Sequence, residues 1–145
     1  MKHDAVSIII PTLNEEKRLG VCLAKIRQLS LQIQIIVADG GSQDKTLSIA
    51  EQFGAVTVRS ALGRGTQCNA GARLADQDIL LFLHADTILP DNALTMIKEF
   101  FITSDHHLAT FRLKFDVDHV LLRGYSFFTR FDSIFTRFGD QGIVC

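Results

Sequence analysis

The chain has 145 residues, of which 47% are hydrophobic and 21% are charged, and this balance suits one soluble globular domain. A mean hydropathy of +0.20 together with 11 Phe excludes global disorder, and the length excludes two ordinary domains. The formal charge of −1 gives no bulk attraction to nucleic acid. The longest apolar runs, such as 79–83, are too short to span a membrane.

The cysteines and the chain ends bear on where the protein works. Cys22, Cys68 and Cys145 are odd in number and lack C-x-x-C spacing, which favours a reducing, cytoplasmic setting without disulfides or zinc. Met1–Asp4 leads straight into an apolar run and leaves no room for a signal peptide. Gly142–Cys145 is typical of the start of a strand, so we expect a C-terminal truncation.

The first part of the chain alternates predicted strands with predicted helices. Val6–Ile10 is a β-branched apolar run closed by Pro11, as in a buried strand. The capping-box spacing of Thr12–Glu15 predicts a helix that opens there, with an apolar face formed by Leu19, Cys22, Leu23, Ile26 and Leu29. The later elements are a strand at 33–38, a helix at 44–53, a strand at 55–58, a flexible turn at 63–65, a helix at 66–75, a strand at 79–83, a helix opening at Pro90 and a strand within 106–115.

This order of elements predicts an α/β fold with a mostly parallel sheet and helices on both faces. Ligands bind such sheets beyond the carboxyl ends of the strands. Three polar clusters fall just after predicted strands, at Asn14–Glu15, Asp39–Ser42 and His84–Asp86. Their common position is the main indication of a binding site.

Asp39 ends the second predicted strand. A carboxylate there can accept a hydrogen bond from a nucleobase ring N–H, while Gly40 and Gly41 allow a ligand to approach the backbone closely. Alternatively, the segment is a turn in which Asp39 and Ser42 cap the helix that follows. The segment alone leaves both interpretations open.

Asp86 is the candidate metal ligand. A strand-end carboxylate beside a diphosphate is a usual way to hold Mg²⁺ or Mn²⁺, both of which prefer oxygen ligands. His84 lies two residues earlier, so its side chain is on the same face as that of Asp86 if the strand continues through both residues. The alternative makes Asp86 a turn cap and His84 an ordinary strand-end residue, and so short a pattern favours it.

Three further polar residues are candidates with ordinary alternatives. Arg64 lies between two glycines and could reach phosphate oxygens from a mobile loop, or be a solvated loop arginine. Asn69 on the next helix could face the same cleft, or serve capping or packing. Asp140, in the helix break 139–142, could act as a general base or simply terminate the helix.

The last third of the chain is rich in Phe, with seven of the 11 lying between Phe111 and Phe138. The sequence is helical in period from Val120, and Arg123, Arg130 and Arg137 recur every seven residues. One interpretation is an amphipathic helix that rests on anionic lipid headgroups. The commoner one is a core-packing helix with a solvated basic edge.

Four short segments, in this order, together resemble family 2 glycosyltransferases, which have the GT-A fold. Ser7–Glu15 resembles the opening IIPxxNE of that family, and Val37–Thr46 resembles its DDGSxDxT turn. Gly63–Ala72 is similar to its G-x-x-x-x-x-N-x-G helix, and Leu83–Thr87 to the metal-holding LDAD segment. The HADT and GDQGI variants look most like a small bacterial subgroup of stand-alone members.

The resemblance implies roles for individual residues. Pro11 and Glu15 would shape the nucleotide pocket, Asp39 would accept from the base of a UDP or similar donor, and Asp86 would ligate Mg²⁺ or Mn²⁺. Asp140 would be the catalytic base. The nucleotide-sugar site is predicted to consist of Pro11, Glu15, Asp39, Gly41, Arg64, Asn69 and His84.

Two departures from the family pattern affect this site. Gly40 stands in place of the second Asp of the DDGS turn, although the first, Asp39, is kept. His84 replaces the first Asp of the metal segment, which bears on the ribose contact and on the preferred metal.

We therefore expect a single GT-A-like domain over 1–145, with a nucleotide-sugar-binding part at 1–102 and the start of an acceptor-side part at 103–145. The implied activity is metal-dependent, inverting transfer of a sugar from a nucleoside-diphosphate donor to a hydroxyl acceptor. The alternative is a truncated remnant that binds a nucleotide or a partner without turnover. Apolar surface around Phe128–Phe138 predicts self-association into a homodimer.

Overall fold

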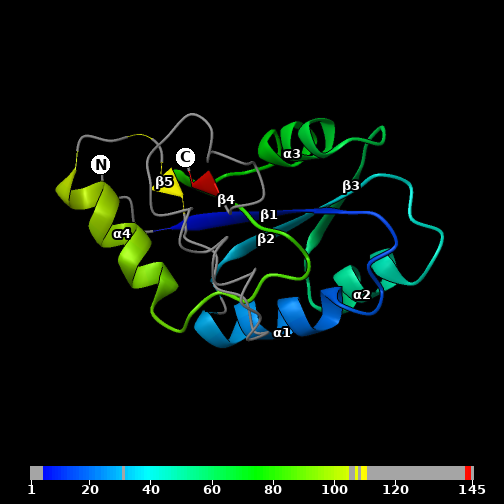
Figure 1. Cartoon of the computed structure of the whole chain (residues 1–145), viewed down its shortest axis with the longest axis horizontal. Helices are drawn as coiled ribbons and strands as arrows, with labels where there is room; N and C mark the ends of the chain where they lie inside the picture. The colour runs from blue at the N-terminus through cyan, green and yellow to red at the C-terminus, as the bar shows by residue number, and fades with distance from the viewer. Residues whose placement is uncertain (1–4, 31, 105–106, 108, 111–142, 145) are drawn as a thin grey trace, which may run out of the picture.

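The fold is organised around one sheet, whose first four strands run parallel (Figure 1). The computed structural model describes residues 5–30, 32–104, 107, 109–110 and 143–144. Within them the strands are β1 (Val6–Thr12), β2 (Gln34–Asp39), β3 (Val56–Arg59), β4 (Ile79–Phe82), β5 (Ala109–Thr110) and β6 (Ile143–Val144). Their order across the sheet is β3-β2-β1-β4-β6-β5, and β6 runs antiparallel to both β4 and β5. The predicted α/β class and mostly parallel sheet are confirmed.

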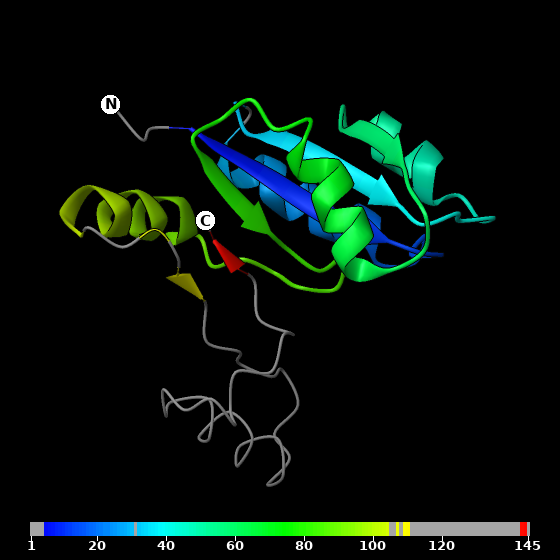
Figure 2. The ribbon, with the colours of Figure 1, turned by 90° about the horizontal axis from the view of Figure 1, so that it is seen from above.

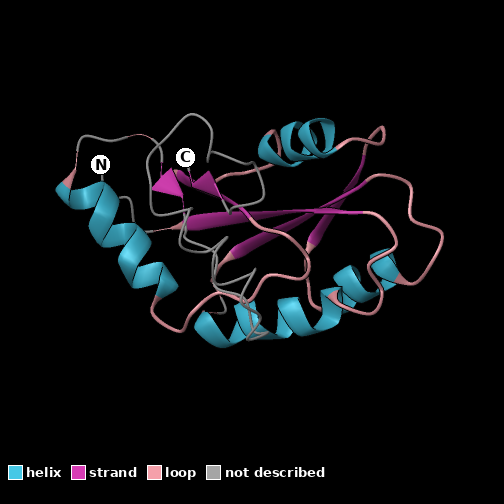
Figure 3. Cartoon of the chain, viewed as in Figure 1, coloured by secondary structure: helices cyan, strands magenta, loops and turns pink. Residues whose placement is uncertain are grey.

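Helices cover both faces of this sheet, as the sequence predicts. They are α1 (Leu19–Leu29), α2 (Thr46–Gln52), α3 (Arg64–Ala72) and α4 (Ala93–Thr103). α1 and α2 lie on one face and α3 lies on the other, with the strands as a layer between them (Figures 2 and 3). In the part of the chain that is described, no helix combines the length and the apolar character that crossing a membrane requires.

The hydrophobic core fills the space between the sheet and the layer of α1, α2 and α4. Alternation along β1 directs Ile8 and Ile10 into this core, while Ile9 faces α3. All three side chains are fully buried, as expected for a parallel strand covered on both faces. From α1 the core receives Leu19, Cys22, Leu23 and Ile26, which confirms the predicted apolar face.

Several helix boundaries differ from the predicted ones. The capping-box prediction is wrong, because α1 begins at Leu19 and Thr12 stays in the β1 ladder opposite Asp39. The strand also continues past Pro11, which pairs in register with Ala38. α4 begins at Ala93, three residues after Pro90. The predicted loop position of Arg64 is wrong as well, because Arg64 is the first residue of α3.

The helix α3 approaches the sheet closely at Gly71. A Cβ atom at this position would lie 2.4 Å from Cγ2 of Ile9, a distance that real Cβ contacts do not reach. Ile9 is β-branched and fully buried, so its side chain has few other rotamers to adopt. Gly71 therefore sets how close α3 lies to β1.

We expect Gly71→Ala to lower the free energy of unfolding by about 1–3 kcal/mol, because the added methyl group overpacks the interface. Gly65→Ala in the same helix is the matched control, since nothing lies within 4 Å of its Cβ position. That control should gain about 0.5–1 kcal/mol, as glycine-to-alanine changes in helices usually do. Urea denaturation of both variants tests the assignment, and equal effects of the two substitutions would contradict it.

Candidate functional site

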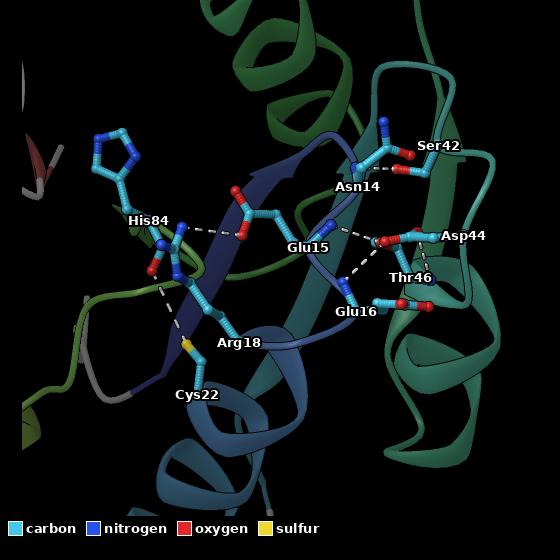
Figure 4. A network of polar contacts seen from close by, with 9 residues as sticks. All are labelled: Asn14, Glu15, Glu16, Arg18, Cys22, Ser42, Asp44, Thr46 and His84. Atoms are coloured by element: carbon cyan, nitrogen blue, oxygen red, sulfur yellow. Dashed lines mark hydrogen bonds and ion pairs between the residues drawn. The ribbon is translucent and has the colours of Figure 1, made fainter.

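The carboxyl ends of β1 and β2 carry two loops that are joined by side-chain-to-backbone hydrogen bonds (Figure 4). The backbone N–H of Asn14 donates to the Ser42 hydroxyl at 2.8 Å, and the N–H of Gln43 donates to the Asn14 side-chain oxygen at 2.9 Å. The N–H of Glu15 donates to the Thr46 hydroxyl at 2.8 Å. The predicted clusters at 14–15 and 39–42 thus form one structural unit.

This unit needs the unusual backbone of Asn14, whose φ of 54° lies in the left-handed region. Asparagine tolerates that region better than most residues with a Cβ. Asp44 secures the far end of the unit, because its carboxylate accepts from the N–H of Thr46 at 2.9 Å and of Glu16 at 3.1 Å. Burial raises the pKa of Asp44, but these hydrogen bonds outweigh it and hold the pKa below 3.8. Residues 14–15 and 39–46 therefore build the two loops at the carboxyl ends of β1 and β2 that border the candidate site.

Asp39 is fully buried, and its carboxylate accepts four hydrogen bonds. One oxygen accepts from the N–H groups of Gly41 at 3.0 Å and Ser42 at 2.8 Å. The other accepts from the hydroxyls of Ser42 and Thr12. Four bonds fill the lone-pair positions of a carboxylate, so Asp39 holds its own turn. The alternative that Asp39 caps the following helix is wrong, because α2 begins at Thr46 without a side-chain hydrogen bond at its N-cap. A bond from a base to Asp39 would require one of these donors to leave.

The same contacts make Asp39 a source of acid sensitivity. Burial raises the pKa of its carboxyl, but the hydrogen bonds from Ser42, Gly41 and Thr12 outweigh burial, and the pKa lies below 3.8. Because the pKa of Asp39 is lower in the folded than in the unfolded protein, its ionised carboxylate stabilises the fold fully at pH values above the unfolded-state pKa. This stabilisation is lost as the pH falls through 3.8 and below.

We expect the free energy of unfolding to fall more steeply between pH 5 and pH 3 in the wild type than in Asp39→Asn. Urea denaturation at several pH values measures both slopes. The substitution should itself destabilise the protein by about 1–3 kcal/mol at pH 6, because the amide NH₂ replaces one of the two accepting oxygens and cannot accept from the donors on that side. Parallel slopes would contradict the stated role of the Asp39 carboxylate.

Gln67 is a site residue that the sequence analysis did not single out. Its side chain is 4% exposed, and Nε2 donates to the backbone carbonyls of Thr12 at 2.7 Å and Ala38 at 2.9 Å. These bonds connect α3 to the ends of β1 and β2. The available signal was a long amide side chain in a helix of otherwise small residues, Thr66–Ala72.

The third predicted cluster forms a tight turn after β4. The N–H of Thr87 donates to the carbonyl of His84 at 3.1 Å, and Asp86 lies exposed on this turn. The Cys22 thiol, from α1, approaches the carbonyls of Thr87 at 3.6 Å and His84 at 3.9 Å. Burial, and then the charge of Asp86, raise the pKa of Cys22 to about 12, so the thiol keeps its proton and remains a donor. The imidazole of His84 points away from Asn14 and Glu15 (Figure 4).

The described turn after β4, residues 84–87, offers a divalent metal one exposed carboxylate, that of Asp86. No group of three or more His, Cys, Asp or Glu side chains that could hold a metal occurs among them. Mg²⁺ in phosphate-transfer sites commonly takes one or two carboxylates and receives its other ligands from water and phosphate. Asp86 therefore fits a metal that a bound diphosphate helps to hold, and does not fit a metal held by protein alone.

The remaining predicted residues divide between two regions. Glu15 lies with the β1 loop and pairs with Arg18 at 3.8 Å, and Pro11 is half-buried near the end of β1. Gly41 has a φ of 105°, which the turn around Asp39 requires and which side chains rarely adopt. Asn69 instead lines a groove of about 470 Å³ formed by Val58, Arg59, Ser60, Thr66, Asn69, Ala70, Arg73 and Leu74. The lining of this groove includes none of the polar residues of the loops after β1, β2 and β4.

Arg64 and Asp140 complete the predicted set. Arg64 is exposed at the start of α3, close enough to Cys68 that its charge acts to lower the thiol pKa, although burial raises that pKa overall. Asp140, the predicted catalytic base, and the stretch from Phe111 to Phe138 lie outside the described residues. Of the predicted C-terminal strand, Ile143–Val144 is described, and it forms β6.

Comparison with known proteins decides the family. Residues 7–142 match the family model described as glycosyl transferase family 2. The chain belongs to this family. The segments that carried the resemblance lie in β1 and its loop, at the end of β2, in α3 and in the turn after β4.

Two curated relatives of this family 2 chain are similar over different lengths. It is 31% identical over 146 residues to 4,4'-diaponeurosporenoate glycosyltransferase of Staphylococcus aureus, which covers 94% of the chain and 38% of the relative. It is 37% identical over 93 residues to the protein of the same name from Staphylococcus haemolyticus, covering 59% of the chain and 25% of the relative. The chain thus spans less than two fifths of the length of these relatives.

Solved structures show the same fold. Glucosyl-3-phosphoglycerate synthase from Mycobacterium tuberculosis, in complex with Mn²⁺, UDP and glucosyl-3-phosphoglycerate, matches with a TM-score of 0.62 and 25% identity. That match covers 72% of this chain and 42% of the synthase. Staphylococcus aureus TarS 1-349 matches with a TM-score of 0.69 and 23% identity, covering 80% of this chain and 38% of TarS. The GT-A fold is confirmed by these matches.

Proposed function

We propose that the protein transfers a sugar from a UDP-sugar to a hydroxyl acceptor. The observation that carries this proposal is the placement of three polar loops, after β1, β2 and β4, at the carboxyl edge of a family 2 sheet. Ligands of parallel sheets bind at this edge. A similar structure, 25% identical, has been crystallised with Mn²⁺ and UDP, which supports a uridine nucleotide as the donor.

The proposed donor site combines backbone and side-chain contacts. Pro11, Glu15 and Gly41 shape the nucleotide pocket where the β1 and β2 loops meet. Arg64 at the start of α3 and His84 after β4 are proposed to contact the donor from either side. Asn69 is exposed and lines the groove beside β3, and its contact with the donor stays a prediction. Asp86 would hold Mg²⁺ or Mn²⁺ together with the diphosphate oxygens.

The chemistry we propose is an inverting displacement. Asp140 takes the proton from the acceptor hydroxyl as its oxygen forms a bond to the anomeric carbon. The bond from that carbon to the diphosphate oxygen breaks, and UDP leaves with the electron pair. A bound divalent cation would supply positive charge that stabilises the departing diphosphate. Single displacement from the opposite face inverts the configuration of the sugar.

The finer assignments rest on the sequence. The segments His84–Thr87 and Gly139–Ile143 support a place in the bacterial subgroup of stand-alone members. The cytoplasmic setting, contact with the inner membrane face, self-association and the division of the domain at residue 102 stay predictions.

Turnover separates an enzyme from a protein that only binds its nucleotide. We expect the chain, incubated with Mn²⁺ and a panel of UDP-sugars, to release UDP from at least one donor, measured by a coupled UDP assay. Water is the acceptor when no other is supplied. Absence of UDP release from every donor, with UDP binding intact, would favour the remnant alternative.

A further inference from the structure

The family resemblance assigns Asp39 as the hydrogen-bond acceptor for the nucleobase, but the turn that ends β2 already occupies this carboxylate. The Asp39 carboxylate is fully buried and is occupied by four donors from its own turn and from Thr12. The neighbouring position is Gly40, which has no side chain. A base that presents a ring N–H at this edge needs an acceptor from another residue.

The side-chain amide of Gln67 is fixed in one orientation beside this turn. Both groups that Nε2 contacts, the carbonyls of Thr12 and Ala38, are acceptors, so the NH₂ end must face them. The helix that carries Gln67 is itself fixed on the sheet by the contact of Gly71 with Ile9. The carbonyl end of the amide is therefore presented on the side away from these strand ends.

The amide occupies the space that a side chain at position 40 would take. A Cβ on Gly40 would lie 3.1 Å from both Cδ and Nε2 of Gln67 and 3.3 Å from Oε1. Position 40 is where the family turn carries its second Asp, so the Gln67 amide lies against the backbone position from which that carboxylate would project. Gly40 and Gln67 thus complement each other in volume.

The Oε1 atom of Gln67 is open to a ligand. Among the described residues, Nε2 makes both hydrogen bonds found for this side chain. No described side-chain nitrogen or oxygen is both enclosed and without a hydrogen-bond partner, so Oε1 must reach solvent although the residue as a whole is 4% exposed. A pre-positioned acceptor at the edge of a binding site costs little entropy to engage.

We propose that Oε1 of Gln67 accepts the ring N–H of the nucleobase and so selects uracil. This inference rests on the proposed function, because it deepens the recognition of the same donor. An amide oxygen accepts and cannot donate, so it pairs with N3–H of uracil and repels the unprotonated N3 of cytosine. Asp39 then supports the turn and does not contact the base.

UDP and its N3-methyl derivative test this assignment, because methylation replaces the N3–H donor with a methyl group and leaves the rest of the nucleotide unchanged. With Mn²⁺ present, calorimetry of the wild type should give roughly 10- to 100-fold weaker binding of N3-methyl-UDP, the effect of one lost buried hydrogen bond and a steric conflict. The ratio of the two dissociation constants is the readout, since a general loss of stability moves both constants together.

Two variants separate the candidate acceptors. Gln67→Met keeps the length of the side chain without the amide, and its ratio should fall to about 1–3. Asp39→Asn should keep the wild-type ratio, even if the substitution disturbs the turn and lowers the affinity for both nucleotides. A ratio that survives in Gln67→Met, or one that collapses in Asp39→Asn, overturns the proposal.

Gly40→Ala decides the question if Gln67→Met does not fold. The backbone of Gly40 lies outside the left-handed region, so alanine is compatible with it, and the added methyl presses on the Gln67 amide. The ratio should fall at least about threefold, while Gly65→Ala, with open space around its Cβ, keeps it. An unchanged ratio in Gly40→Ala contradicts the proposal. Wild-type protein that binds both nucleotides equally refutes the Gln67 assignment alone, whereas protein that binds neither refutes the proposed function as well.

Discussion

Replacing Asp86 with alanine is expected to abolish the contribution of Mn²⁺ to UDP binding. Asp86 is the one carboxylate that the described part of the turn after β4 presents to solvent at the edge of the sheet. Loss of a residue behind the metal ligands commonly costs 10- to 100-fold in metal affinity, so loss of a direct ligand should cost on the order of 100-fold or more. Calorimetric titration of UDP with and without Mn²⁺ measures this effect.

The matched control for this variant is Asp91→Ala. Asp91 is also an exposed carboxylate, five residues further along the same connection, and it has the same charge. Its removal should leave the Mn²⁺ dependence of UDP affinity unchanged. If Asp86→Ala retains that dependence, or if both variants lose it equally, then Asp86 is not the ligand and the effect of Mn²⁺ has another origin.

Replacing Asp140 with asparagine should remove turnover while leaving UDP affinity within about threefold of the wild type. A general base typically contributes about 10²- to 10⁴-fold to a rate, and asparagine keeps the shape of the side chain without its basicity. The rate of UDP release from the best donor, beside a calorimetric dissociation constant, separates the two effects.

Asp132→Asn provides the comparison, because it makes the same chemical change eight positions earlier in the Phe-rich stretch. Its rate of UDP release should stay close to that of the wild type. Full activity in Asp140→Asn would remove the base assignment, and a common loss of both binding and turnover would indicate a structural role instead.

Patterning was sufficient to predict the sheet and its helices. The apolar runs at Val6–Ile10 and Ile79–Leu83 each became a buried parallel strand, since few other arrangements cover both faces of such a run. The apolar period of α1 identified its buried face correctly. These features depend on local periodicity, which a single sequence displays directly.

The helix starts were harder to predict because tertiary pairing competes for the same residues. Thr12 has the spacing of a helix cap, but its backbone is held in register with Asp39 and its hydroxyl donates to the Asp39 carboxylate. The helix can begin only after the loop that follows, at Leu19. A capping motif at the end of a parallel strand is therefore ambiguous from sequence alone.

Gln67 illustrates what the pattern of the site could not reveal. Its importance comes from two backbone carbonyls, at Thr12 and Ala38, which are 55 and 29 positions away in the chain. Backbone groups carry no sequence signature, so nothing near Gln67 marks it as a connector. Asp39 shows the opposite case. It lies in a motif that predicts a ligand contact, but its carboxylate accepts hydrogen bonds from the backbone of its own turn.

The most direct test of the account is a titration of the wild-type chain with UDP, with Mn²⁺ present and absent. A site built from one exposed carboxylate and the loops at the ends of β1 and β2 should bind UDP in a metal-dependent manner. We predict at least tenfold tighter binding with Mn²⁺, which corresponds to about 1.4 kcal/mol. UDP affinity that is absent, or that Mn²⁺ does not change, would contradict a metal-assisted nucleotide-sugar site on this sheet.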